Sequence, residues 1–256
     1  MKHSTGSRNR LPVWSILFWL AAWQLGAMLM NEPLLLVTPT KVLIRLTELC
    51  RKADFWKSIF FTAGHILAGF LLSALLGVGL GILAWRFGAV RQLLAPLTAA
   101  VKAVPVASFV ILALLWVSSR DLSILISLLI GFPVLYSGTL AGLDNVDPAM
   151  EEMARVFRIP FGKRMQALYL HQLDPFLYSA LNVAAGLCWK SGVAAEIIGI
   201  PDGSVGEKLY KAKIYLETPD LFCWTLVIVL LSAGTEKLLK VLLDRLREVR
   251  DRDPGR

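Results

Sequence analysis

Residues 144–175 read DNVDPAMEEMARVFRIPFGKRMQALYLHQLDP, a charged and proline-punctuated stretch between two strongly apolar regions of the chain. Within it, Asp147 followed by Pro148 predicts the start of a helix, because a capping carboxylate accepts hydrogen bonds from free amides and proline is tolerated at the first helical position. Pro160 disfavours helical backbone at the residue before it, so this helix is expected to end there.

A second amphipathic helix is expected from Gly162 to Leu173, with Asp174 and Pro175 closing it. Together the two short helices form a helix-turn-helix element, which the apolar surroundings place at a membrane surface. An element of this shape is suited to contact another protein.

The flanking regions are typical of a membrane protein. Of the 256 residues, 56% are hydrophobic and 18% are charged, whereas about a quarter of the residues of a soluble domain are charged. We expect an all-α fold with six transmembrane helices, of which the third is interrupted by Lys102 and Pro105. The apolar runs that approach the ~20 residues needed to cross a bilayer lie at about Trp14–Met30, His65–Trp85, Leu93–Val117, Leu122–Leu140, Leu177–Ile200 and Leu221–Val241.

Basic residues indicate how these runs are oriented. Lysine and arginine are more frequent in the segments that lie inside when the N terminus is cytoplasmic, and this bias favours cytoplasmic N and C termini. We therefore expect cytoplasmic tails at residues 1–13 and 247–256, one transmembrane domain at residues 14–246, and a cytoplasmic loop at residues 144–175. The first apolar run has no small-residue cleavage site after it, so it is interpreted as a retained span and not as a signal peptide.

Several classes of function find no support in the sequence. The net charge of +8 comes from lysine and arginine at the ends of spans and in the C-terminal tail, where anionic lipid headgroups are nearer partners than nucleic acid. Cys50, Cys188 and Cys223 form no CxxC pair and the histidines are far apart, so neither a disulfide framework nor a metal site is indicated. Gly162-Lys163 is followed by arginine, so the phosphate-binding Gly-Lys-Ser/Thr pattern is absent and no nucleotide site is expected in this chain.

Charged residues within the apolar runs are candidates for a transport pathway. Lys190 and Glu196 lie in the fifth run, and ionisable groups at this depth usually face a bundle interior or a water path. The two residues are six positions and about 120° apart on a helix, so they do not share a face and no salt bridge is expected. Lys190 either lines the path of an anion, or it has a packing role in which it snorkels or pairs with a neighbouring helix, and both interpretations stay open.

Glu196 and Pro105 are further candidates. Glu196 lies between Gly192 and Gly199 on a small-residue face suited to close helix contact, which predicts a structural role. Pro105, three residues after Lys102, is either a simple break in the third span or a hinge in a pathway.

The stretch EMARVFRI at residues 152–159, followed by Leu-His at 170–171 and then Pro175, resembles the Glu-Ala-Ala…Gly…Leu-Pro loop of bacterial ABC importer permeases. Met153 and Arg158 stand where that family usually has alanine and glycine, and the histidine of 170–171 stands where it usually has proline. Further stretches resemble the nitrate, sulfonate and taurine branch of these permeases over roughly Leu36–Leu246, namely TPT at 38–40, KAVP at 102–105, GFP at 131–133 and AAEIIG at 194–199.

This resemblance implies that residues 144–175 hold a coupling helix that docks on a cytoplasmic ATPase subunit, with Phe161 filling a pocket of that subunit. The coupling residues that it implies are Glu152, Ala154, Arg158, Pro160, Phe161 and Gly162. The residues assigned to the translocation pathway or gate are Lys190, Glu196, Lys102 and Pro105.

The resemblance also implies an assembly in the bacterial inner membrane. Two copies of the permease would form a homodimer with two ATPase subunits, which bind ATP and Mg, and an extracytoplasmic binding protein would deliver the solute. The chain itself would bind no cofactor and catalyse no reaction. The transported solute is expected to be a small anion such as a sulfonate, taurine or nitrate, although the same branch also carries heteroaromatic vitamin precursors. A secondary transporter or channel driven by an ion gradient is the main alternative, and a membrane-embedded enzyme is the third.

Overall fold

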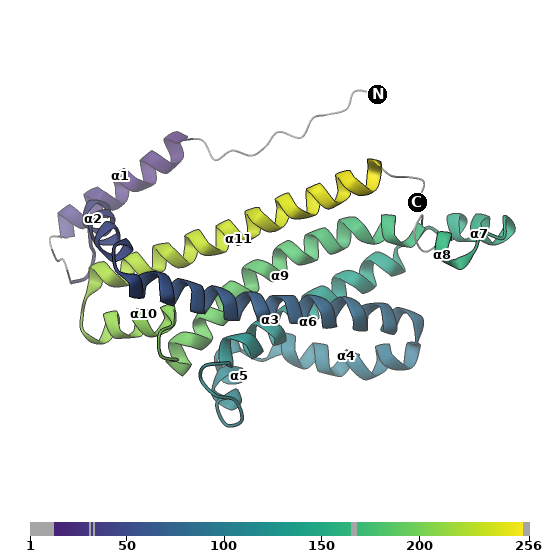
Figure 1. Ribbon diagram of the computed structural model, residues 1–256, viewed down its shortest axis with the longest axis horizontal. Coiled ribbons are helices and arrows are strands. Elements are labelled where there is room, and N and C mark those ends of the chain that lie inside the picture. Colours follow the sequence, from purple (N-terminus) through teal and green to yellow (C-terminus); the bar gives the residue numbers. More distant parts are fainter. Residues whose placement is uncertain (1–12, 31, 33, 165–167, 253–256) are drawn as a thin grey trace.

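The computed structural model describes residues 13–30, 32, 34–164 and 168–252, and the regular structure in these ranges is helical throughout. The long helices run side by side (Figure 1). The helices are α1 (Val13–Met30), α2 (Pro39–Cys50), α3 (Ala53–Arg86), α4 (Gly88–Ala103), α5 (Val106–Ala113), α6 (Leu122–Asp144), α7 (Pro148–Val156), α8 (Phe161–Arg164), α9 (Leu170–Gly199), α10 (Val205–Ile214) and α11 (Thr218–Arg252).

Glycines bring α3 and α6 into backbone contact. A Cβ atom added to Gly77 would lie 2.7 Å from the Cβ of Leu135, and one added to Gly81 would lie 2.8 Å from the Cβ of Thr139. Because these glycines recur every four residues on α3, one face of that helix is smooth enough for α6 to lie directly against it. Apolar spans have little hydrophobic drive to associate in lipid, so such close packing supplies much of the contact energy.

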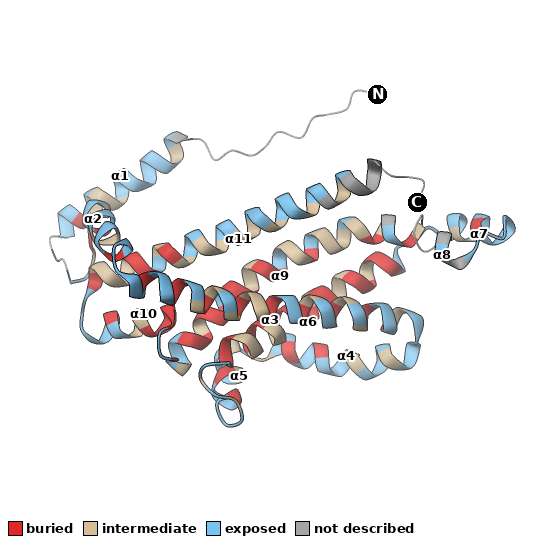
Figure 2. Ribbon diagram, in the orientation of Figure 1, coloured by how far each residue is buried: buried red, intermediate tan, exposed pale blue. Residues whose placement is uncertain are grey.

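α9 joins this pair at a point where three small residues meet. A Cβ atom on Gly131 of α6 would lie 2.9 Å from both the Cβ of Ser73 on α3 and the Sγ of Cys188 on α9. The Ser127 hydroxyl of α6 donates a hydrogen bond to the Cys188 carbonyl at 3.2 Å. Buried residues are concentrated where these helices meet, whereas α1 and the far half of α11 are mostly exposed (Figure 2).

Within the described residues, two helices are by length and composition able to cross a membrane, namely α3 and α6. The pair formed by α4 and α5 adds a third if it is counted as one span, although it bends by 105°. α1 is apolar but shorter, and α9 and α11, which contain the fifth and sixth predicted runs, do not meet the same limits on hydropathy and charge. The all-α prediction is therefore confirmed, and the number of spans stays a prediction.

Two expected helices differ from the structure. The run Leu93–Val117 is not one helix, because α4 ends at Ala103 and α5 begins at Val106. Pro105 is the N-cap residue of α5 and lacks the N–H that would continue the ladder from α4. The separation of the two helices thus follows from the proline at which the sequence analysis expected an interruption.

The expected helix from Gly162 to Leu173 is wrong in its C-terminal boundary. α8 covers only Phe161–Arg164, residues 165–167 lie outside the described ranges, and α9 then begins at Leu170 and continues through Pro175. Proline removes a single hydrogen bond near the start of a helix. Leu173 is buried in a cluster with Leu143 and Tyr169, and this packing holds the first turns of α9 in place despite the proline.

Candidate functional site: the α7–α8 loop and the α6–α9 groove

The α7–α8 loop, residues 144–164, contains the helix that the Asp147-Pro148 pair predicts. The Asp147 carboxylate accepts a hydrogen bond from the Ala149 amide at 2.9 Å, and α7 begins at Pro148. Glu151 lies in the first turn, where negative charge complements the helix dipole, and it pairs with Arg155 at 3.3 Å. The predicted start of the helix is confirmed.

α7 ends in a turn that places Arg158 in left-handed backbone. Its φ is 51°, and the Ile159 amide donates to the Ala154 carbonyl at 3.0 Å while the Arg158 amide donates to the Arg155 carbonyl at 3.0 Å. These two bonds define a Schellman motif, whose left-handed position is usually glycine. The position where the permease pattern usually has glycine therefore keeps a glycine-like conformation with arginine in its place.

One side of α7 is buried against the rest of the protein, and the other side exposes apolar side chains. Ala154 is buried at 4% exposure, whereas Phe157 is 72% exposed. Glu152 and Gly162 are also exposed. The exposed large apolar side chains of α7 and its end are Met150, Met153, Val156 and Phe157, and we call them the α7 apolar patch. Exposed apolar clusters of this kind mark contact sites for other molecules.

The side chain of Phe161, the residue expected to anchor a partner, lies outside the described part of the chain. Phe157, which the sequence analysis did not select, is the aromatic side chain that the structure shows exposed on this loop. Pro160 is exposed between α7 and α8.

Aromatic packing fixes the loop to the long helices. The Tyr169 ring, 3% exposed, packs edge-on against Trp85 at the end of α3, with ring centroids 4.9 Å apart. Burial raises the pKa of the Tyr169 hydroxyl, and the charge of Glu151 and a hydrogen bond to its carboxylate raise that pKa further. The Tyr169 hydroxyl therefore lies near the Glu151 carboxylate of α7, and Tyr169 directly precedes α9, so α7 is close to the start of α9.

Ion pairs strengthen the same end of the molecule. Arg91 of α4 contacts Asp144, the last residue of α6, at 2.9 Å. Arg247 of α11 contacts the Asp174 carboxylate at 2.9 Å, donates to the Asp174 carbonyl at 3.1 Å and lies 4.2 Å from the centroid of the Tyr178 ring. These contacts connect α4 with α6 and α11 with α9 at the end of the molecule that carries the α7–α8 loop.

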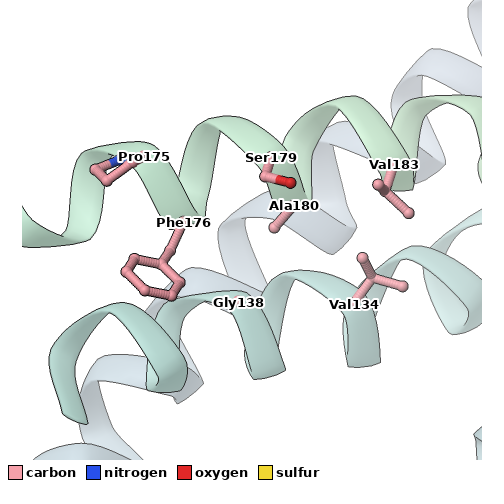
Figure 3. A pocket seen from close by; sticks show the side chains of 7 residues that line it. All are labelled: Val134, Gly138, Pro175, Phe176, Ser179, Ala180 and Val183. Carbon is pink, nitrogen blue, oxygen red and sulfur yellow. The ribbon is translucent and has the colours of Figure 1, made fainter. Parts of the chain in front are cut away.

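A groove follows the line where α6 and α9 meet, and we call it the α6–α9 groove (Figure 3). It encloses about 370 Å³ and its walls are mostly apolar. It is not covered by α3, because α6 directs Leu135 and Thr139 toward α3. The residues that line the groove are Val134, Gly138, Pro175, Phe176, Ser179, Ala180 and Val183.

Lys190 lies on the face of α9 that lines this groove, two turns beyond the lining residue Val183. Phe176, Val183 and Lys190 follow one another at intervals of seven residues, and this spacing places them on the same side of a helix. Val183 is 52% exposed, and Lys190 is exposed and forms no ion pair with any described residue. An uncompensated ammonium group near the middle of an apolar run is costly unless water or another subunit surrounds it.

Lys102 connects α4 to α6. Its Nζ donates a hydrogen bond to the Ser137 hydroxyl of α6 at 2.8 Å. Lys102 is exposed and lies in the last turn of α4, two residues before the bend at Val104 and Pro105. Ser137 precedes Gly138, but adjacent residues of a helix point about 100° apart, and neither Lys102 nor Ser137 lines the groove.

Glu196 lies elsewhere. It is fully buried, and its carboxylate accepts hydrogen bonds from Thr62 and from the Gly206 amide. Lys190 and Glu196 therefore lie on different sides of α9, and among the described residues they form no salt bridge, as their spacing predicts. Nothing in the sequence pointed to Thr62, because the contact joins residues that are 134 positions apart.

Comparison with known proteins identifies the family. Residues 73–248 match the family of binding-protein-dependent transport system inner membrane components. The chain belongs to this family. The matched region extends from the middle of α3 to the cytoplasmic-tail boundary expected from the sequence, and it contains both the α7–α8 loop and the α6–α9 groove.

Similar permeases cover most of the chain. The putative aliphatic sulfonates transport permease protein SsuC of Bacillus subtilis is 25% identical over 92% of this chain and 86% of its own length. The taurine transport system permease protein TauC of Escherichia coli is 25% identical over 88% of this chain and 83% of its own. The bicarbonate transport system permease protein CmpB of Synechococcus elongatus is 28% identical over 73% of this chain and 71% of its own. These matches confirm the recognition of an ABC importer permease of this branch.

Proposed function

We propose that this permease forms, as a homodimer, the pathway of an ATP-driven importer for a small anion in the bacterial inner membrane. The observation that carries this proposal is Lys190, an exposed lysine in an apolar run without an ion-pair partner among the described residues. Helix geometry places it on the same side of α9 as the groove residue Val183, two turns farther along. A cation in this position offsets part of the cost of bringing an anion into a low-dielectric space.

In this proposal the chain crosses the membrane six times. The spans are α1, α3, the bent pair α4 and α5, α6, α9 and α11. The positive charge bias then places both termini and the α7–α8 loop in the cytoplasm, where two ATPase subunits bind ATP and Mg and the permease itself needs no cofactor. An extracytoplasmic binding protein delivers the solute at the opposite end, where α2 and α10 lie (Figure 1).

A second copy of the permease covers the α6–α9 groove in this assembly. The groove is apolar and open, Lys190 lies on the same side of α9 two turns beyond it, and Lys102 is bonded to α6 at Ser137. Two facing copies would enclose a path lined by lysines from both subunits. The bend at Pro105 then acts as a hinge that allows α5 to move relative to α4.

Coupling to ATP hydrolysis begins at the α7–α8 loop. Glu152 and the α7 apolar patch contact the ATPase, and Ala154, on the buried side of α7, faces the permease. Because Tyr169 lies near α7 and directly precedes α9, a displacement of α7 also displaces the helix that carries Lys190. Nucleotide and solute each favour one member of a two-state equilibrium, which gives alternating access.

The class of substrate follows from charge. The relatives are named for aliphatic sulfonates, taurine and bicarbonate, and each of these solutes carries an anionic group. An aliphatic sulfonate, taurine or nitrate therefore fits the proposed path better than a cation. A secondary transporter driven by an ion gradient is the alternative.

Uptake by reconstituted permease, ATPase and binding protein tests this proposal. We expect ATP-dependent uptake of a labelled anion, and Lys190→Arg should keep appreciable uptake because it keeps the charge. Lys190→Met keeps much of the side-chain length, so it should reduce uptake at least tenfold while the complex still assembles. Uptake driven by an ion gradient without ATP would contradict the importer, and normal uptake by Lys190→Met would contradict the role of the lysine.

A further inference from the structure

Glu196 connects three helices through one buried carboxylate oxygen. Its Oε2 accepts a hydrogen bond from the Thr62 hydroxyl of α3 at 2.8 Å and one from the Gly206 amide of α10 at 3.2 Å. Glu196 and Thr62 are both fully buried. Oε1 of the same carboxylate is buried and has no hydrogen-bond partner among the described residues. The contacts of Oε2 favour one arrangement of its neighbours, because any other arrangement leaves the Thr62 hydroxyl and the Gly206 amide without this acceptor.

The start of α10 depends on these contacts. An α-helix leaves the first amides without partners inside the helix. In α10 the Val205 amide donates to the Thr62 hydroxyl at 2.9 Å, the Gly206 amide donates to Glu196, and the Glu207 amide donates to the Ser204 hydroxyl at 2.9 Å. Two of these three acceptors therefore belong to other helices, so α10 is capped in part by α3 and α9.

The packing at this point requires glycine. A Cβ atom on Gly206 would lie 2.6 Å from the carbonyl carbon of Glu196 and 2.7 Å from the Ile197 amide nitrogen. The chain reverses between α9 and α10 through left-handed backbone at Ile200, with φ of 48°, and at Gly203, with φ of 81°. α10 consequently lies with its first turn directly against the backbone of α9.

We propose that Glu196 is a positioning residue that locks the start of α10 to α9 and α3, so that α10 moves with α9 as one body. The carboxylate acts as a hydrogen-bond acceptor in this role and does not line the path. The consequence for transport rests on the proposed function. Because α9 also carries Lys190, the lock makes α10 move together with the helix that bears this lysine.

Amide hydrogen exchange of residues 203–209 in the purified permease complex tests the lock without any transport assay. Glu196→Ala should accelerate exchange of the Val205 and Gly206 amides at least tenfold, because it removes the acceptor of Gly206 and frees Thr62. Glu196→Gln keeps a carbonyl acceptor and should restore exchange to within about threefold of the unmodified protein. Glu217→Ala, which removes an exposed carboxylate after α10, is the matched control and should change nothing.

Thr62 provides a second, independent pair of variants in case Glu196→Ala does not fold. Thr62→Ser keeps the hydroxyl and should leave exchange of the Val205 amide unchanged, whereas Thr62→Val keeps the shape and should accelerate it at least tenfold. Unchanged exchange in both Glu196→Ala and Thr62→Val would overturn the proposal, as would equal acceleration by Glu196→Gln and Glu196→Ala. Loss of uptake with unchanged exchange would support the importer while contradicting the lock.

Discussion

At the scale of single residues, Arg158 shows that a backbone conformation can be kept when the residue type changes. Arg158 departs from the residue type usual at its position, yet its backbone adopts the left-handed conformation that glycine normally supplies. The conformation is imposed by the two hydrogen bonds that end α7, and arginine tolerates it because its exposed side chain has no packing to satisfy. The sequence predicted that the helix ends before Pro160, whereas α7 ends at Val156 and the left-handed turn at Arg158 follows it.

Substitutions at Arg158 test this account of the turn. Left-handed backbone costs ordinary residues roughly 1 kcal/mol or more, costs glycine little, and is least favourable for β-branched residues. In the Arg158→Gly variant, the amides of residues 148–159 should therefore exchange no faster than in the unmodified protein. In the Arg158→Val variant they should exchange about fivefold faster, which corresponds to a loss of roughly 1 kcal/mol in the free energy of local opening. If the valine variant exchanged as slowly as the glycine variant, the turn would not depend on the left-handed residue.

At the scale of elements, local signals predicted helix starts and interruptions better than helix lengths. The Asp147-Pro148 start and the break beside Pro105 follow from backbone chemistry within a few residues, and both are present. α9 starts before the predicted end of the preceding helix because Leu173 and Tyr169 pack against Leu143. That contact is tertiary, so no periodicity in the chain reveals it.

The same limit applies to the candidate site. Lys190 and Glu196 were identifiable because ionisable residues are rare in apolar runs, and their angular separation followed from helix geometry. The partners of Glu196 come from α3 and α10, and the choice between its gating and structural roles depends on those partners. The α6–α9 groove likewise requires the packing of α6 on α9 and has no counterpart in the sequence.

The α7 apolar patch yields a prediction about the element that contacts the ATPase. Phe157→Ala should weaken binding of the ATPase subunit roughly 30-fold or more, because loss of an aromatic anchor typically costs about 2 kcal/mol or more. Phe60 of α3 is similarly exposed at 71%, so Phe60→Ala is the matched control and should bind normally. Affinity is measured by co-purification at graded ATPase concentrations. Normal binding by Phe157→Ala, with loss of binding by Phe161→Ala, would transfer the anchor to Phe161.

At the scale of the whole molecule, a tightly packed group of helices leaves a groove open on its surface. α3, α6 and α9 form a tightly packed unit through glycine contacts, and ion pairs connect this unit to α4 and α11 at the end that carries the α7–α8 loop. The α6–α9 groove is left open, and Lys190 lies on the same side of α9 two turns beyond it. An exposed lysine within an apolar run is unfavourable in lipid, and the proposed second copy of the chain would remove that conflict.

Accessibility of position 190 tests the central claim that Lys190 lines a path opened alternately to the two sides of the membrane. The measurement uses Lys190→Cys in a Cys50→Ser background, because Cys188 and Cys223 are buried and Cys50 is exposed, and it is made on the permease reconstituted with its ATPase. We predict that an impermeant thiol reagent labels position 190 from one side without nucleotide and from the other side when ATP is trapped. Labelling that is absent in both states, or that comes from the same side in both, would contradict the account.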